Sequence, residues 1–262
     1  MARALTNQMQ KALQEIAHGK EISITSRTLT GLVNRGLADV SGKLTNEGWK
    51  QAVVALPLEE QCQYLGITYQ KLPGLEFKGN PELAAWRYFS SQGYVGGYCE
   101  GGPILLLIRA AALEVLTNIN TFKSREDACT RATEAQFTIH RQSSHLILNA
   151  ISTSKTSQIV RHFNEIYSSP LIEEWYPGLT CNSISQLFES LGAERLMQIA
   201  TAFMEAPYTY RAGWPDLTMT NGVEMLWAEI KTIDRLHLSQ ITTISRMKPL
   251  LPGSVRVVQL TS

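Results

Sequence analysis

Cysteine is scarce in this sequence, and no cysteines have the spacing of a zinc site. The 262 residues contain four cysteines and no Cys-x-x-Cys motif. This pattern is typical of reduced thiols and argues against a disulfide scaffold or a zinc ribbon. The four are Cys62, Cys99, Cys129 and Cys181. His140 and His145 are five positions apart, which suits one helix face poorly, so we do not expect them to bind metal.

Targeting and low-complexity signals are also missing. No apolar segment follows a basic start, and there is no internal repeat. The one long apolar run, 104–113, is too short for a membrane span and contains Arg109. A net charge of +1 argues against indiscriminate coating of nucleic acid. We expect an intracellular protein without a membrane partner, located in the cytoplasm or nucleoid, or in the nucleus if the source is eukaryotic.

A segment near the C-terminus contains most of the informative residues. Gly213-Trp214-Pro215-Asp216-Leu217 is followed by Glu229-Ile230-Lys231 and by Asp234-Arg235-Leu236. Between them lies Asn221-Gly222, a strong hairpin signal. A two-residue turn there pairs Thr220 with Val223 and Asp216 with Trp227. Because side chains alternate along a strand, we expect Trp227, Glu229 and Lys231 to share a face with Asp216. Leu226, Ala228 and Ile230 then form an apolar face that packs on a helix.

Two carboxylates beside a lysine suit a metal-dependent phosphodiesterase. Mg²⁺ prefers oxygen ligands and keeps several waters, and a bound cation activates water and screens phosphate oxygens. Lys231 supplies a compact positive charge that orients water or stabilises developing negative charge. Taken singly, Pro-Asp is often a turn and Glu-x-Lys a solvated charge pair. Their joint occurrence around one hairpin favours a catalytic site.

These motifs resemble a VRR-NUC domain of the PD-(D/E)XK nuclease superfamily. The resemblance implies an α/β (α+β) fold with a restriction-endonuclease-like core. It also implies that Asp216 and Glu229 bind Mg²⁺ or Mn²⁺, that the carbonyl of Ile230 approaches the metal, and that Lys231 is the catalytic lysine. Thr232-Ile233 is one residue shorter than the usual Gly-Pro-Asn. The displaced Ser239-Gln240 leaves a role for Gln240 in doubt.

A second match lies upstream, where Gly97–Pro103 leads into an apolar run typical of a buried helix. Glu100 at this entry resembles the helix-borne acid of the Fanconi-associated nuclease branch of the family, which makes it a third metal ligand and catalytic residue. The alternative is that Glu100 only caps the helix. Trp86, Tyr88, Phe89 and Tyr94 precede it. Core packing is the favoured interpretation of these aromatic residues, with stacking on unpaired bases as the alternative.

The interval between Glu100 and Asp216 is long for a minimal nuclease core. It contains predicted helices at 125–142, 158–167, 184–191 and 193–205, and we expect a helical insertion at about 120–205. This insertion resembles that of the Fanconi-associated branch, which implies a monomer acting on branched DNA. An added helical layer also tends to cover the face that a closed dimer needs.

The N-terminal part indicates a small separate module. Helices at 5–17, 26–34 and 45–56, a strand at 22–24 and a small β-wing at 38–44 resemble a winged helix. Residues 1–50 carry seven Lys or Arg against four acids, and a structural or protein-binding role is the alternative to DNA binding. The candidate DNA contacts are Arg27, Arg35, Lys43 and, beside the nuclease motif, Arg235.

We therefore expect two domains. Residues 1–75 form the winged-helix-like module, and residues 76–262 form the nuclease domain. The expected function is a metal-dependent, structure-selective DNA nuclease, a flap endonuclease or exonuclease, in DNA repair or processing. The alternatives are a dimeric Holliday-junction resolvase and a non-cleaving DNA-binding regulator.

Overall fold

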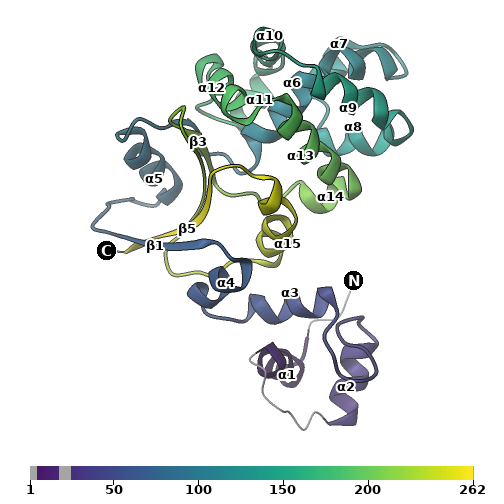
Figure 1. The fold of residues 1–262 in the computed structure, drawn as a ribbon, viewed down its shortest axis with the longest axis vertical. Helices are drawn as coiled ribbons and strands as arrows, with labels where there is room; N and C mark the ends of the chain where they lie inside the picture. Colours follow the sequence, from purple (N-terminus) through teal and green to yellow (C-terminus); the bar gives the residue numbers. More distant parts are fainter. Residues whose placement is uncertain (1–4, 18–24, 262) are drawn as a thin grey trace.

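A mixed α+β architecture with one five-stranded sheet is seen in the computed structural model, which describes residues 5–17 and 25–261 (Figure 1). The mixed fold class expected from the sequence is confirmed. The strands are β1 (Thr68–Pro73), β2 (Val95–Gly97), β3 (Leu217–Thr220), β4 (Met225–Lys231) and β5 (Ser254–Thr261). The helices of the first half are α1 (Asn7–Ala17), α2 (Ser26–Val33), α3 (Asn46–Val54), α4 (Leu58–Leu65), α5 (Pro81–Ser90) and α6 (Gly102–Ile119).

The strand order in the sheet is β1-β5-β4-β3-β2. β1 and β4 both run parallel to β5, whereas β3 is antiparallel to β4 and to β2. The carboxyl ends of β1, β4 and β5 consequently lie at the same end of the sheet. β4 finishes there at Lys231, which pairs with Gln259, and β1 finishes at Pro73, which pairs with Thr261.

The two faces of the sheet are buried by different helices. Leu226, Ala228 and Ile230 pack with Ala85 and Phe89 of α5, which confirms the apolar face predicted for β4. Met225 and Trp227 point to the other face and join the main core with α6 and α15 (Leu238–Met247). Figure 1 shows α5 on one side of the sheet and α15 on the other.

The register predicted for the β3–β4 hairpin is wrong by two residues. Leu217 pairs with Ala228 and Thr218 pairs with Trp227, so the turn holds four residues instead of two. The Asn221 side chain explains this, because its Oδ1 accepts hydrogen bonds from the backbone N–H groups of Val223 and Glu224. A shift of two residues preserves the alternation of side chains, and the predicted faces of β4 are therefore unchanged.

Helices fill the interval between α6 and β3. They are α7 (Arg125–Thr130), α8 (Thr133–Ile139), η1 (Arg141–Ser143), α9 (Ser144–Ser152), α10 (Thr156–Tyr167), α11 (Pro170–Trp175), α12 (Cys181–Leu191), α13 (Ala193–Glu205) and α14 (Pro207–Tyr210). The predicted helices at 158–167, 184–191 and 193–205 match α10, α12 and α13. The predicted helix at 125–142 is divided, and α9 and α11 were not predicted. A further short helix, η2 (Lys248–Leu250), lies between α15 and β5.

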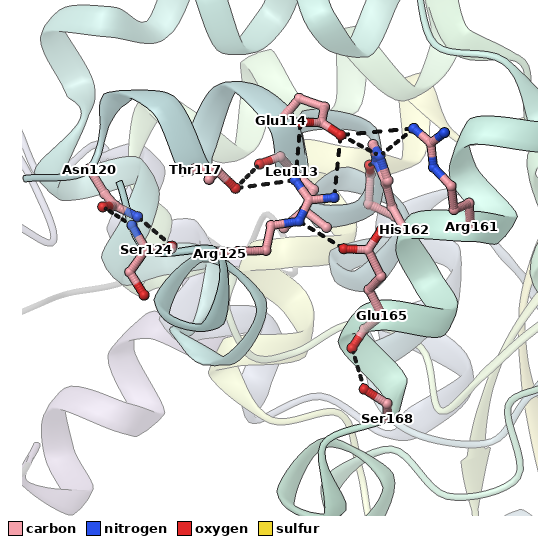
Figure 2. A network of polar contacts seen from close by, with 11 residues as sticks. Leu113, Glu114, Thr117, Asn120, Ser124, Arg125, Arg161, His162, Glu165 and Ser168 are labelled. Carbon is pink, nitrogen blue, oxygen red and sulfur yellow. Dashed lines mark hydrogen bonds and ion pairs between the residues drawn. The ribbon is translucent and has the colours of Figure 1, made fainter. Parts of the chain in front are cut away.

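A polar network joins these helices to α6 (Figure 2). Arg125 of α7 donates to Glu165 of α10 at 2.8 Å and pairs with Glu114 of α6 at 3.3 Å. The buried His162 of α10 donates through Nδ1 to the carbonyl of Ala110 at 2.7 Å. These contacts fix α7 and α10 against α6. By length and composition α6 is the one described helix that could cross a membrane, but most of it is buried inside the protein.

The N-terminal helices α1 to α3 have a small core of their own, with Leu13, Leu32 and Ala52 among its buried residues. The predicted wing is a tight turn closed by a single bridge between Ala38 and Leu44. The strand expected at 22–24 lies outside the described residues. Residues 58–73, which fall in the predicted N-terminal module, form α4 and the edge strand β1. α4 packs into the main core.

Candidate active site

Two of the predicted site residues are buried at the carboxyl end of β4. Glu229 is 1% exposed and Lys231 is 5% exposed. The Lys231 Nζ atom lies 2.9 Å from Glu229 Oε1 and 3.1 Å from Asp234 Oδ2. Alternation along β4 puts both side chains on the face away from α5, as predicted. The lysine is thus held between a buried carboxylate and a half-exposed one.

Asp216 lies just before β3, and its Oδ2 accepts a hydrogen bond from the backbone N–H of Ile230 at 2.8 Å. This bond fixes the aspartate to the strand that carries Glu229 and Lys231. Burial raises the pKa of Asp216 to about 6, against the lowering effect of the Ile230 hydrogen bond. The negative charges of Glu82, in the first turn of α5, and of Glu100 raise it further.

Glu229 and Lys231 have pKa values raised for different reasons. Burial raises the pKa of Glu229 well above its usual range, and the negative charge of Asp216 adds to the effect. Burial acts to lower the pKa of Lys231, but Glu229 and Asp234 outweigh it and the net shift is upward. Lys231 is therefore an ammonium ion at neutral pH and acts as a cation instead of a general base. The raised pKa values of Glu229 and Asp216 mean that both carboxyl groups hold a proton more tightly than they would in water.

Gln240 joins the site although the sequence left its role in doubt. Its Nε2 donates to Glu229 Oε1, and its Oε1 accepts from the backbone N–H of His237 at 2.8 Å. Gln240 lies in the first turn of α15 and is buried. This contact could not be predicted from the order of Ser239 and Gln240 alone, because it depends on how α15 is placed beside β4.

Gln240→Leu is expected to lower kcat by about tenfold while leaving DNA affinity close to wild type, because Gln240 holds Glu229 without reaching substrate. The matched control is Gln186→Leu, since Gln186 is a half-buried glutamine of α12 whose amide donates to Asn182 on the same helix. Steady-state cleavage kinetics measure the effect. Equal rates for Gln240→Leu and the control would show that the Gln240–Glu229 contact has no role in positioning.

The Glu100 side chain contacts the backbone of Gly213 and neither Glu229 nor Lys231. Its carboxylate accepts a hydrogen bond from the backbone N–H of Gly213, across 113 residues of sequence. The N-cap of α6 is Gly101, without a side-chain cap bond, so the capping alternative for Glu100 is not observed. Gly213 has φ +82°, and a Cβ there would clash with the Ser239 carbonyl. Glycine is thus required where the Asp216 segment passes Glu100 and α15.

One observation tests whether these carboxylates fit Mg²⁺ or Mn²⁺. Glu229 Oε2 is buried and has no hydrogen-bond partner within residues 5–17 and 25–261. An unpaired buried carboxylate oxygen beside a second carboxylate is costly unless a cation accompanies it. Nowhere in these ranges do three or more Asp, Glu, His or Cys side chains gather to hold a metal. Asp216 and Glu229 therefore fit as a pair, and Glu100 as a third ligand stays a prediction.

The residues predicted to contact DNA lie in varied environments. Arg235 donates to the backbone carbonyl of Ala55 at 2.8 Å, which ties the loop after β4 to the end of α3. Arg35, two residues past the end of α2, donates to the Gly31 carbonyl at 3.0 Å. Arg27 and Lys43 are exposed. None of these contacts tests DNA binding, so the assignment of all four stays a prediction.

A buried glutamine connects α4 to the loop that follows β4. Gln61 of α4 is fully buried, accepts from the Leu236 N–H at 2.8 Å and donates to the Leu236 carbonyl at 3.2 Å. Leu236 follows Asp234, which contacts Lys231. Gln61 could not be predicted from the sequence, because a lone glutamine in a short helix forms no motif.

Comparisons with known proteins identify a similar fold only at the level of structure. No protein-family profile and no curated protein matches the sequence. Among solved structures, the crystal structure of paFAN1 bound to 5′ flap DNA with a 2-nucleotide flap and a gap has a TM-score of 0.58 and 17% identity. The corresponding complex with a 1-nucleotide flap has a TM-score of 0.59 and 16% identity. Both matches cover 96% of this chain, which spans about half of those chains, 48% and 49%.

Proposed function

We propose that this protein is a metal-dependent, structure-selective DNA nuclease of the VRR-NUC type with a PD-(D/E)XK core. The observation that carries the proposal is the buried Glu229–Lys231 pair at 2.9 Å, with Asp216 bonded to the intervening Ile230. The fold similarity to paFAN1, crystallised with flap DNA, supports the same assignment. A winged-helix role for residues 1–75 and a function in DNA repair belong to the proposal as well.

The metal would be Mg²⁺ or Mn²⁺, held by Asp216, Glu229 and the Ile230 carbonyl, with Glu100 as a further ligand. When bound, such an ion activates water and screens the phosphate oxygens. The protein contributes the rest. Gln240 fixes Glu229, Asp234 fixes Lys231, and the ammonium of Lys231 stabilises negative charge that develops on the phosphate. The buried setting strengthens this electrostatic contribution, because little water screens it.

Cleavage is expected to fall as the pH decreases through about 6. Burial raises the pKa of Asp216 to about 6, and a metal-binding carboxylate must be ionised. Protonation therefore competes with the metal below that pH, and higher metal concentration should move the profile to lower pH. Initial cleavage rates across a pH series at two Mg²⁺ concentrations test this. A profile that does not move with metal concentration would remove the link to these carboxylates.

A panel of labelled DNA substrates tests the proposed activity. Flap, four-way junction, single-stranded and plain duplex DNA are incubated with Mg²⁺, with Mn²⁺ and with EDTA. The proposal predicts metal-dependent cutting and preference for a flap or end over plain duplex. Cutting confined to four-way junctions would favour a resolvase, and binding without any cutting would favour a non-cleaving regulator.

The helical insertion supports a monomer. Helices α7 to α14 follow α6 and cover one side of the molecule (Figure 1). A closed dimer needs a self-complementary face of its own. Light scattering after size exclusion distinguishes the two states, and a dimeric mass would support the resolvase alternative.

A further inference from the structure

A groove that the proposed catalytic residues do not use lies between α5 and the loop that follows β1. Its volume is about 620 Å³, within the range of small-molecule sites. The loop contributes Leu75, Glu76, Phe77, Lys78 and Asn80, and α5 with its C-cap contributes Leu83, Ala84, Arg87, Tyr88 and Ser91. The groove thus has an aromatic, apolar and cationic lining.

The loop that forms one wall has a defined backbone. Gly74 donates to the Thr261 carbonyl at 3.0 Å where the loop leaves the sheet. At its other end, Asn80 accepts from the Leu83 N–H at 2.9 Å and so caps α5. Lys78 has φ +38° and Gly79 has φ +85°, which turns the chain sharply into the helix. Phe77 is therefore presented from a short segment anchored at both ends.

The groove lies at the same end of the sheet as the candidate active site. The loop that follows β1 and the loop that follows Lys231 leave the sheet at the same end, because β1 and β4 both run parallel to β5. Glu82 precedes the groove residue Leu83 in α5, and its charge acts on Asp216. A strand that reaches from the catalytic carboxylates to the groove would pass around this end of the sheet, because α5 covers the face opposite to Glu229 and Lys231.

The lining suits a nucleotide, which presents a flat base and an anionic phosphate. Phe77 and Tyr88 are partly buried against the sheet core, so their rings are held in place beside the groove. Arg87 is exposed and forms no ion pair with any residue the structure describes. Lys78 pairs with Glu76 at 3.6 Å, but both side chains are more than 80% exposed, and water screens such a pair. One acid against two cations leaves a net positive charge.

We propose that this groove binds unpaired nucleotides of a DNA substrate, with bases on Phe77 and Tyr88 and phosphates at Lys78 and Arg87. The proposal rests on the assignment of the protein as a DNA nuclease. Aromatic rings stack on any base, and cations neutralise the backbone without regard to sequence. The groove would thereby hold a single-stranded tail next to the cleaved position.

Binding of a fluorescent oligothymidylate of about eight nucleotides, followed by anisotropy in EDTA, tests the proposal without cleavage. Phe77→Leu keeps apolar packing but removes the flat ring, and Arg87→Gln removes a charge from the surface. Phe122→Leu and Lys123→Gln are matched controls. Phe122 is 89% exposed, and both lie in the loop between α6 and α7.

Each groove variant is expected to weaken binding about five- to tenfold. Arg87→Gln should also reduce, by about one, the slope of the logarithm of the binding constant against the logarithm of the salt concentration. The controls should stay within about twofold of wild type. Melting temperatures show whether each variant is folded. If Phe77→Leu is unstable, Arg87→Gln still tests the proposal, because Arg87 is exposed and its replacement leaves the core intact. Groove variants that bind like the controls, or a wild type that does not bind the oligonucleotide, would overturn the proposal.

The outcome is separable from that of the proposed function. A wild-type protein that never cuts DNA, yet loses oligonucleotide binding in both groove variants, would refute the nuclease assignment and retain the groove as a DNA site. A wild type that cuts flaps while its groove variants bind and cut normally would retain the nuclease and remove the groove.

Discussion

Asp216→Asn is expected to reduce DNA cleavage to background and, in metal-free buffer at neutral pH, to raise the melting temperature. Burial raises the pKa of Asp216 to about 6 from its ordinary 3.8, so the folded protein holds this proton more tightly than the unfolded chain. The associated stability is present below about pH 4 and is lost as the pH rises through about 6. Above that range the ionised carboxylate is a cost of about 1–3 kcal/mol.

Asparagine removes this cost because it is neutral and can still accept from the Ile230 N–H. Thermal unfolding with and without Mg²⁺ measures the effect. Mg²⁺ should stabilise the wild type and leave the variant unchanged. Asp39→Asn is the control, since a hydrogen bond from Ser41 lowers the pKa of Asp39 and neutralisation there should not raise the melting temperature. A destabilised Asp216→Asn in metal-free buffer would contradict this account of Asp216.

Lys231→Ala is expected to lower kcat by about 10²–10³-fold while DNA affinity changes little. Lys231 is the cation that contacts Glu229, at 2.9 Å, and it is 5% exposed. Its removal deletes the positive charge of the proposed site and leaves Glu229 buried without its cation. The residues predicted to contact DNA are unchanged in this variant, so DNA binding should persist. Single-turnover cleavage and anisotropy on the same flap DNA separate the two effects.

Lys155→Ala provides the control for the loss of a positive charge, because Lys155 is exposed on the helical insertion. It should cut DNA at the wild-type rate. Lys231→Arg keeps the charge but places a larger, planar group in a buried site, so we expect only partial recovery of activity. Cleavage by Lys231→Ala at the rate of Lys155→Ala would show that the lysine has no catalytic role.

Much of the hairpin could be predicted from residue spacing alone. The alternation of side chains along β4 depends only on strand geometry, and it correctly separated the apolar face of Ala228 and Ile230 from the face of Trp227. The register could not be predicted from Asn221-Gly222. The Asn221 side chain binds two backbone N–H groups and stabilises a four-residue turn, and sequence does not tell these turns apart.

The contacts that complete the site depend on tertiary packing. Gln240 of α15 contacts Glu229, and Gln61 of α4 holds the loop after Lys231 through Leu236, a contact that spans 175 residues. Glu82 acts on Asp216 only because α5 packs on the hairpin. No local pattern encodes these distances. The helices α9 and α11 also escaped prediction, since short helices with weak caps resemble loops in sequence.

The central claim is that Asp216 and Glu229 hold a divalent cation beside Lys231. Titration of Mn²⁺ followed by electron paramagnetic resonance tests it directly, with the wild type, Asp216→Asn and Glu229→Gln compared at neutral pH. The account predicts that the wild type binds Mn²⁺ and that each substitution abolishes or strongly weakens binding. Equal binding by all three proteins would contradict it.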